Sequence, residues 1–353
     1  MRDSRTFTVD DPRFSTARVV GPSMLSLDGA AHGRHRSPFF AAFHRGGAAE
    51  RLPAFAEAEA IRLVEAIRPD GSADLRRDLS GPLAVAVVAQ ALGLGDVAPA
   101  EILALYTRIV GGVTSLSGDQ GAPGAGLEEG QDTTGIGEPE PDSVAAFGTL
   151  AGLLRAVIDG ASAGQRSVLA TAAAGGQLTP DEIISDAAVV MFGGIDTTDG
   201  MIANAALHLL GHPDQLDLVR ADPARLPAAV EESLRLEPAA AIVDRYATAD
   251  TEVAGAKIGA GDRVTVSLSG ANRDPSVFAD PDRFDLARPD AERHLAFAHG
   301  PHFCIGAPAA RAETLAGLRA LLTLPGLRLD PASPAEPRGL VFRKPPTLRV
   351  LWD

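Results

Sequence analysis

The stretch that decides the fold is His294-Leu-Ala-Phe-Ala-His-Gly-Pro-His-Phe-Cys-Ile-Gly-Ala-Pro308, which contains Cys304, the only cysteine of the chain. Gly300, Pro301 and Gly306 bracket this cysteine, and an apolar run with helical spacing follows it. The pattern predicts that Cys304 lies in a turn leading into the N-terminus of a helix. Unpaired backbone N–H groups and the helix dipole favour a thiolate there, and a thiolate suits a soft metal.

A lone cysteine also has a simpler interpretation. In an intracellular protein such a residue is usually a small buried hydrophobe without a chemical role. The loop by itself does not separate packing from metal binding, so the rest of the chain must decide between them.

The composition describes a globular protein. The chain has 353 residues and is 45% hydrophobic, which is ample for an extensive core. It contains no run of about 18 uncharged apolar residues and no apolar signal segment at the N-terminus, so we expect a soluble, cytoplasmic protein without membrane contact. A single cysteine cannot form an internal disulfide, which agrees with a reducing compartment. The formal charge of −14 argues against nucleic acid as a partner, because nucleic acid attracts clustered cations.

The hydrophobic periodicity predicts a mainly α protein with a small β region, folded as a single domain over 1–353. Helices are expected over 54–67, 82–92, 98–110, 144–158 and 167–174, with short strands between 242 and 269 and at 327–329 and 348–351. Residues 117–142 are rich in Gly, Pro and acidic residues, and they predict either a mobile lid or a disordered insertion.

The longest predicted helix starts at Thr179-Pro-Asp-Glu, a capping box with proline at the first helical position, and stops at Gly211. Its middle contains Gly193-Gly-Ile-Asp-Thr-Thr, in which two adjacent glycines cost roughly 1 kcal/mol each relative to alanine. An acid beside an alcohol at a weakened point of a buried helix indicates a proton relay next to a cavity. The alternative is a tolerated kink in which a partner satisfies Asp196.

Two pairs of charged residues have ordinary explanations when each is taken alone. Glu232 and Arg235 are spaced i, i+3 on a predicted helix, which is usual for a surface ion pair. His32 and Arg36 are one helical turn apart on an early helix, which is usual for a solvated basic helix end.

In chain order, these motifs resemble those of the cytochrome P-450 superfamily, in its soluble bacterial branch. The family's cysteine loop, Phe-Gly-x-Gly-x-His-x-Cys-x-Gly, is matched by Phe297, Gly300, His302, Cys304 and Gly306, with Ala298 in place of the first glycine. The family's central-helix signature falls on Gly193, Gly194, Asp196, Thr197 and Thr198. Its Glu-x-x-Arg pair is matched by Glu232 and Arg235, and its later arginine by Arg283.

The resemblance implies a b-type haem (iron protoporphyrin IX) between the long central helix and the cysteine loop. Cys304 would be the axial thiolate of the iron. The other cofactor-binding residues implied are His32, Arg36, Arg245 and His302 for the haem propionates, and Gly193, Phe297 and Gly306 against the porphyrin. Glu232, Arg235 and Arg283 would form a buried ion network that holds the coil carrying the loop.

The resemblance also implies an activity. Asp196 and Thr197 match the pair that supplies protons during dioxygen activation. The implied function is a haem-thiolate monooxygenase that inserts one oxygen atom of O2 into a C–H bond, by hydroxylation or epoxidation, of a hydrophobic small molecule of secondary metabolism. Ferredoxin and ferredoxin reductase would supply electrons, with docking near Arg34, Arg293 and Arg311. The implied pocket is lined near residues 20–27, Val189, Val190, Gly193, 239–243 and 340–342.

Two alternatives remain at this stage. One is a haem-thiolate binding or sensing protein without oxygenase activity, and the other is a helical protein without haem in which Cys304 is core packing. The chain also departs from the family, which usually has a first helix and leading strands before the segment matching Asp11-Pro-Arg-Phe-Ser. We therefore expect either a reduced β region or another chain covering the sheet edge, because an uncovered edge invites pairing.

Overall fold

The computed structural model describes residues 1–44, 47–117, 138–161 and 167–353. The chain is 57% helical with short strands, which confirms the prediction of a mainly α protein with a small β region. Most of the predicted lid, residues 118–137, lies outside the described residues. The chain divides into two compact units: unit 1 contains residues 1–48, 89–192 and 244–265, and unit 2 contains 49–88, 193–243 and 266–353.

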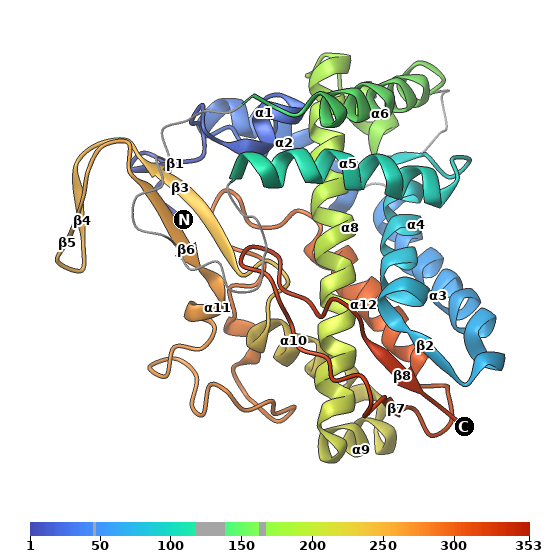
Figure 1. The fold of residues 1–353 in the computed structure, drawn as a ribbon. Helices are drawn as coiled ribbons and strands as arrows, with labels where there is room; N and C mark the ends of the chain where they lie inside the picture. The colour runs from blue at the N-terminus through green and yellow to red at the C-terminus, as the bar shows by residue number, and fades with distance from the viewer. Residues whose placement is uncertain (45–46, 118–137, 162–166) are drawn as a thin grey trace. The chain divides into compact units, whose positions relative to one another are not determined.

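Unit 1 is built mainly from helices (Figure 1). Its α5 packs along α6 and α1, and α2 packs against α7. In chain order, its elements are β1 (Phe7–Thr8), α1 (Ser15–Val20), α2 (Gly29–His44), α5 (Pro99–Ser117), α6 (Pro141–Asp159), α7 (Val168–Ala174), α8 (Pro180–Gly211) as far as Phe192, most of β3 (Ile242–Ala247), and the β4–β5 hairpin (Thr251–Val253 and Ala256–Ile258). β1 pairs with β3 in antiparallel register, Phe7 opposite Ala247. Strand β6 (Arg263–Ser267) follows the hairpin and crosses the division between the units.

Unit 2 carries the rest of α8 and the C-terminal helices and strands. Its antiparallel sheet has the order β2-β8-β7, with Ser72 opposite Leu351. Its elements are most of α3 (Gly47–Ile67), η1 (Arg68–Asp70), β2 (Ser72–Asp74), the π-helical turn η2 (Arg76–Ser80), most of α4 (Gly81–Leu92), α9 (Pro213–Ala221), η3 (Pro223–Arg225), α10 (Leu226–Leu236), α11 (Leu268–Ala271), η4 (Ala291–Arg293), α12 (Ala307–Leu321), β7 (Arg328–Leu329) and β8 (Arg349–Leu351).

The long helix α8 forms as its capping signals predict. The N–H of Thr179 donates to a carboxylate oxygen of Glu182 over 2.8 Å, and the N–H of Glu182 donates to the Thr179 hydroxyl over 3.3 Å. These reciprocal bonds satisfy two backbone donors that the first helical turn leaves without partners. The helix then runs for 32 residues to Gly211, which confirms the predicted start and stop.

Helices α5 and α6 are longer than predicted. The sequence prediction ended the first helix at residue 110, and the next two residues, Gly111 and Gly112, have low helix propensity. In the structure α5 continues to Ser117, and a Cβ at Gly112 would overlap the side chain of Ser143 in α6. The close approach of the two helices therefore outweighs the low helix propensity of glycine.

Among the described residues, one helix, α6, has the length and the apolar composition of a membrane-spanning helix. Of the residues in its most apolar 18-residue stretch, 22% are buried. It carries charged residues that pair within unit 1: the guanidinium of Arg108 lies 2.5 Å from Asp142, and Arg155 pairs with Asp181. Buried helices of soluble proteins meet the same length criterion, so this helix does not establish a membrane span.

Candidate functional site

Cys304 lies in a tight turn immediately before α12, as the sequence predicts. Its backbone N–H donates to the carbonyl of Phe297 over 2.9 Å, and the N–H of Phe303 donates to Gly300 over 3.0 Å. Helix α12 begins at Ala307, with Gly306 as its N-cap. Cys304 is half-buried, so the turn presents its side chain at a helix N-terminus, where the dipole favours a thiolate.

Two residues of this turn have a left-handed backbone, Ala298 with φ of 60° and Gly300 with φ of 83°. Glycine adopts this conformation without steric cost, whereas a Cβ brings a cost of about 1 kcal/mol. The resemblance places glycine where this chain has Ala298, and the structure supplies the reason for a glycine there. The alanine is small enough to fit but strains the turn.

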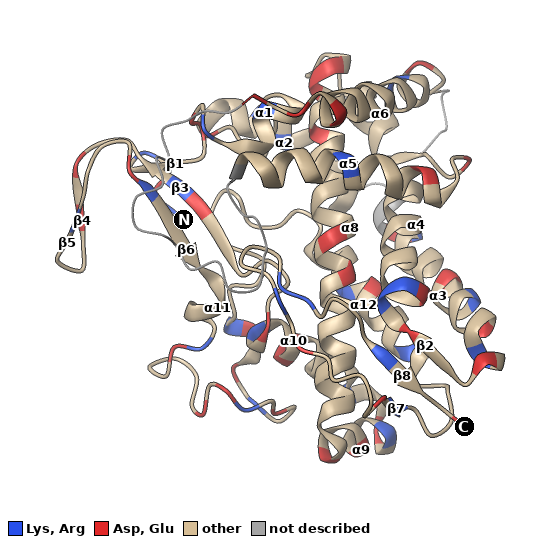
Figure 2. Cartoon of the chain, viewed as in Figure 1, with Lys and Arg blue, Asp and Glu red and all other residues tan. Residues whose placement is uncertain are grey.

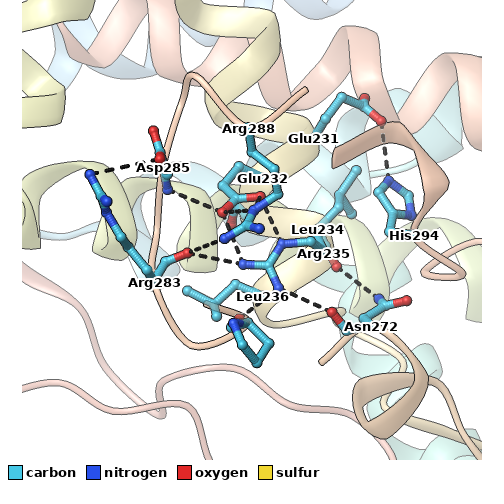
Figure 3. Close-up of polar contacts among 12 residues, drawn as sticks. Glu231, Glu232, Leu234, Arg235, Leu236, Asn272, Arg283, Asp285, Arg288 and His294 are labelled. Carbon is cyan, nitrogen blue, oxygen red and sulfur yellow. Dashed lines mark hydrogen bonds and ion pairs between the residues drawn. The ribbon is translucent and has the colours of Figure 1, made fainter. Parts of the chain in front are cut away.

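The start of the turn is held by a half-buried carboxylate, Glu231 on α10. His294 Nε2 lies 3.1 Å from one carboxylate oxygen of Glu231 (Figure 3), and the guanidinium of Arg311 on α12 donates over 2.6 Å and 2.8 Å. Burial acts to raise the pKa of Glu231, but the hydrogen bonds from Arg311 and His294 outweigh it and lower the pKa to about 2. The guanidinium of Arg311 also lies 4.5 Å above the ring of Phe297.

Glu232 and Arg235 form the predicted buried pair, with Nε and Oε2 2.8 Å apart and both side chains fully buried. Arg235 also donates to the carbonyls of Asn272, Pro281 and Arg283 at 3.0, 2.7 and 3.1 Å (Figure 3). The guanidinium therefore satisfies three carbonyls of the coil that precedes the cysteine turn. Asn272 continues this link, because its side-chain oxygen accepts from the N–H of Leu295 over 2.7 Å.

The third side chain of this network is that of Arg288. The prediction that the Arg283 side chain joins the network is therefore wrong. Arg288 Nε lies 2.9 Å from Glu232, and its side chain is 6% exposed. The side chain of Arg283 is 63% exposed and lies 3.7 Å from Asp285 (Figure 3). Arg283 contributes its carbonyl, which accepts from both Arg235 and Arg288. The coil between the two arginines bends so that the later one faces Glu232.

The two adjacent glycines of α8 have different roles. A Cβ at Gly194 would overlap the Val88 side chain of α4, whereas a Cβ at Gly193 would meet no atom within 4 Å. Gly194 therefore permits close helix packing, and Gly193 leaves an open face on α8. Thr197, one turn later, donates its hydroxyl hydrogen to the Gly193 carbonyl.

Asp196 is held by Lys344, which the sequence did not identify. The Lys344 ammonium donates to the Asp196 carboxylate, and it also donates to Asp199 over 2.8 Å. Asp199 accepts from Arg76 over 2.5 Å and from Ser80 over 2.6 Å. Burial acts to raise the pKa of Asp199, but Lys344 and Arg76 outweigh it and lower the pKa. The structure therefore agrees with the alternative in which Asp196 has a charged partner, namely Lys344.

Of the remaining predicted cofactor residues, three belong to unit 1 and His302 belongs to unit 2, and their role stays a prediction. His32 and Arg36 lie on α2, with His32 6% exposed. Arg245 on β3 is also 6% exposed, and burial lowers its pKa. Buried cations suit buried anionic groups, because charge-assisted hydrogen bonds offset desolvation. His302, in the cysteine turn of unit 2, is half-buried.

Arg34, predicted near the docking surface, is paired within unit 1. Its guanidinium lies 2.6 Å from Glu182 of α8. The next residue, His35, is buried with Nδ1 2.9 Å from Asp186, whose other oxygen accepts from the N–H of Met24 over 2.6 Å. Burial raises the pKa of Asp186 to about 8. These contacts join α2 to the first part of α8.

Some predicted pocket residues lie together within their own unit. In unit 2, Ala240 and Phe342 form a β-bridge, and the N–H of Ala241 donates to Val341 over 2.8 Å. Leu340 and Phe342 are exposed apolar residues there, at 56% and 37%. In unit 1, a hollow of about 290 Å³ includes Pro22, Ser26 and Leu27 among its lining residues.

The residues of unit 2 fit a thiolate-ligated planar cofactor. Cys304 supplies a soft donor at a helix N-terminus, and a Cβ at Gly306 or at Gly193 would meet no atom within 4 Å, so neither backbone position is covered by other side chains. Within the described ranges, no three His, Cys, Asp or Glu side chains group as a metal site. An iron held by a porphyrin requires only the single protein thiolate.

A family model described as Cytochrome P450 matches residues 163–347, which is more than half of the chain. The chain belongs to the cytochrome P450 family. This P450 is similar to two curated relatives. The cytochrome P450 monooxygenase PikC of Streptomyces venezuelae is 36% identical over 80% of this chain and 63% of PikC, so the match spans less than two thirds of that protein. The nocardicin C N-oxygenase of Nocardia uniformis subsp. tsuyamanensis is 32% identical over 98% of this chain and 86% of that protein.

A solved structure is also similar to this P450. The crystal structure of CalO2 matches 98% of this chain and 87% of its own chain, with a TM-score of 0.81 and 30% identity. The P450 fold predicted from the sequence is therefore confirmed. Arg288, Lys344 and Glu231 were missed because each meets its partner across a long sequence separation, although His294, a partner of Glu231, lies in the stretch that decided the fold.

Proposed function

We propose that this protein is a haem-thiolate monooxygenase acting on a hydrophobic small molecule of secondary metabolism, by hydroxylation or epoxidation. The observation that carries the proposal is the placement of Cys304 in a rigid turn at the N-terminus of α12. A b-type haem bound there by the Cys304 thiolate would supply dioxygen activation. PikC is named a monooxygenase and the Nocardia relative an N-oxygenase, which supports oxygen transfer as the class of reaction.

The chain's own residues provide the other requirements of this reaction. Gly193 leaves one face of α8 open. The hydroxyl of Thr197, which is hydrogen-bonded to the Gly193 carbonyl, can donate and accept protons next to this face. Asp196 supplies an ionisable group on the same helix. The exposed apolar residues Leu340 and Phe342 favour a hydrophobic ligand.

Electron supply is part of the proposal. We propose ferredoxin and its reductase as donors, with docking next to the cysteine turn. Arg293 is exposed on η4, whereas Arg311 is partly exposed and paired with Glu231, which makes Arg293 the more accessible cation. Exposed arginines would attract an acidic redox partner, because opposite charges accelerate the encounter of two proteins. We further propose a cytoplasmic location and a single folded domain.

A reduced carbon-monoxide difference spectrum of the haem-loaded protein tests the cofactor, and substrate-dependent NADPH oxidation with a surrogate ferredoxin tests the activity. We expect a thiolate-type Soret band that disappears in Cys304→Ala while the far-ultraviolet circular dichroism is unchanged. A band without any turnover would favour the haem-thiolate sensing alternative. Absence of the band in the wild-type protein would contradict both haem proposals.

A further inference from the structure

Lys344 is one of two lysines in the chain, and it comes from a rigid segment of unit 2. The segment 338–344 closes on itself, because Arg338 and Lys344 exchange backbone hydrogen bonds of 3.0 and 3.2 Å. The N–H of Arg343 donates to Ala239 over 2.9 Å, and the side chain of Asn204 on α8 donates to the Arg343 carbonyl over 2.9 Å. The backbone therefore sets where the lysine side chain starts.

The packing of α8 leaves room for this side chain. A Cβ at Gly200 would lie 3.5 Å and 3.6 Å from Cδ and Cβ of Lys344, and 2.9 Å from the Cβ of Ala239. A larger residue at this position would displace the segment that carries the lysine. Gly200 thus permits the aliphatic part of Lys344 to cross the helix surface, with the side chain 13% exposed.

The ammonium group has two carboxylate partners of different character. Most of α8 is uncharged, and acidic residues occur at intervals along it (Figure 2). Asp199 is 5% exposed and is also held by Arg76 and Ser80, so it is a fixed anchor. Asp196 is 21% exposed, and its carboxylate is recorded with Lys344 as its partner.

The ammonium group of Lys344 has partners besides the Asp196 carboxylate. Lys344 Nζ also donates to the backbone carbonyl of Asp196 over 3.2 Å and to Asp199 over 2.8 Å. An ammonium has three donors, so these two acceptors and the Asp196 carboxylate use all of them. Two carboxylates face two cations in this cluster, Lys344 and Arg76, and removal of the lysine would leave one cation for two acids.

We propose that Lys344 is a positioning residue for Asp196: its ammonium group fixes where the Asp196 carboxylate lies on α8, next to Thr197. The inference rests on the proposed monooxygenase function. In the structure the Thr197 hydroxyl donates to Gly193 while Asp196 accepts from Lys344, so the acid and the alcohol are separately engaged. Without the ammonium, Asp196 is repelled by Asp199 and loses its defined position.

The first test measures the ion pair independently of activity. Haem-loaded protein is treated with an amine-acetylating reagent, and the modification rates of Lys344 and Lys257 are followed by peptide mass spectrometry. Lys257 lies exposed on β5 and serves as the internal reference. We expect Lys344 to react about tenfold more slowly than Lys257, and Asp196→Asn to accelerate Lys344 severalfold without affecting Lys257. An unchanged Lys344 rate in Asp196→Asn would overturn the inference.

The second test measures the role. Lys344→Met should lower the amount of product formed per NADPH consumed by roughly threefold to tenfold. This loss is smaller than the rate effect of removing a proton donor itself. The carbon-monoxide spectrum and the substrate KM should not change. Lys344→Arg should restore part of the coupling, and Lys257→Met should match the wild type. In an Asp196→Asn background, Lys344→Met should have no further effect. An equal loss in both backgrounds, or no loss in the wild-type background, would overturn the role.

The two proposals fail in distinguishable ways. Absence of the thiolate-type band, or of turnover, overturns the monooxygenase function and with it any effect of Lys344 on catalysis. A normal band and normal turnover, together with unchanged labelling in Asp196→Asn, overturn the positioning role alone.

Discussion

The guanidinium of Arg288 lies 2.9 Å from the carboxylate of Glu232, and both side chains are almost completely buried. Glu232 also holds Arg235, so one buried carboxylate pairs with two buried arginines. Such a network is costly to assemble, yet removal of one member leaves an uncompensated charge in the interior. The network carries the coil that leads to the cysteine turn, which links the stability of this coil to the placement of Cys304.

Arg288→Met should therefore destabilise the protein by about 3–5 kcal/mol, because Glu232 keeps only one cation. Arg283→Met is the matched control, since its side chain is 63% exposed and its contribution to the network comes from the backbone carbonyl. We expect that control to change the unfolding free energy by less than about 0.5 kcal/mol. Denaturant unfolding of both variants measures the difference, and equal losses would show that Arg283 contributes through its side chain.

Acid should loosen the cysteine turn through Glu231. Its folded-state pKa, about 2, lies below the ordinary value of 4.5, so its stabilising contribution is fully present above pH 4.5 and is lost as the pH falls from there toward 2. The shift corresponds to roughly 3 kcal/mol. Glu231→Gln should remove most of this contribution at pH 7 and flatten the stability profile below pH 4.5. Glu65→Gln, in an exposed pair with Arg68, is the control, and a profile unchanged by Glu231→Gln would refute the assignment.

The two adjacent glycines of α8, Gly193 and Gly194, should respond in opposite directions to substitution by alanine. Gly194→Ala forces the new methyl group against Val88 and should cost about 1–3 kcal/mol. Gly193→Ala meets open space and should stabilise the apoprotein by roughly 0.5–1 kcal/mol through helix propensity. Thermal unfolding of the two apo variants gives the comparison. If Gly193→Ala nevertheless weakens haem binding, the open face serves the cofactor, whereas unimpaired binding would speak against that use.

Ala298→Gly should relieve the strain in the cysteine turn. The φ of 60° at Ala298 costs an L-residue about 1 kcal/mol, part of which is offset by the greater freedom of glycine in the unfolded chain. We expect a net stabilisation of up to about 0.5 kcal/mol, measured as a rise in Tm. Ala296→Gly, two residues earlier, provides the comparison and should only destabilise. A lower Tm for Ala298→Gly would mean that the methyl group contributes packing that exceeds the strain.

Thr197→Ala should uncouple NADPH consumption from product formation, because the proposed proton route loses its hydroxyl group. The hydroxyl bonds back to Gly193 in the structure, so its loss leaves the helix backbone intact and the fold should be preserved. Thr197→Ser keeps the hydroxyl and should retain coupling. The measurement is the ratio of product to NADPH consumed with the true substrate. Unchanged coupling in Thr197→Ala would remove this residue from the proton route.

The sequence by itself determined the features whose parts lie close together along the chain. The capping box of α8, the i, i+3 pair of Glu232 and Arg235 and the turn around Cys304 each span four residues or a single loop. Backbone geometry then decides which atoms meet, and residue spacing reports it directly.

Only the tertiary structure decided which distant residues complete the site. Arg288 rather than Arg283 faces Glu232, Arg311 reaches Glu231 across 80 positions, and Lys344 reaches Asp196 across 148. Such contacts depend on how helices pack and coils bend, and similar residues along the chain compete for each partner. The Cys304 turn could therefore be predicted from its motif. The charged residues that hold the turn and Asp196 in place could be identified only in the tertiary structure.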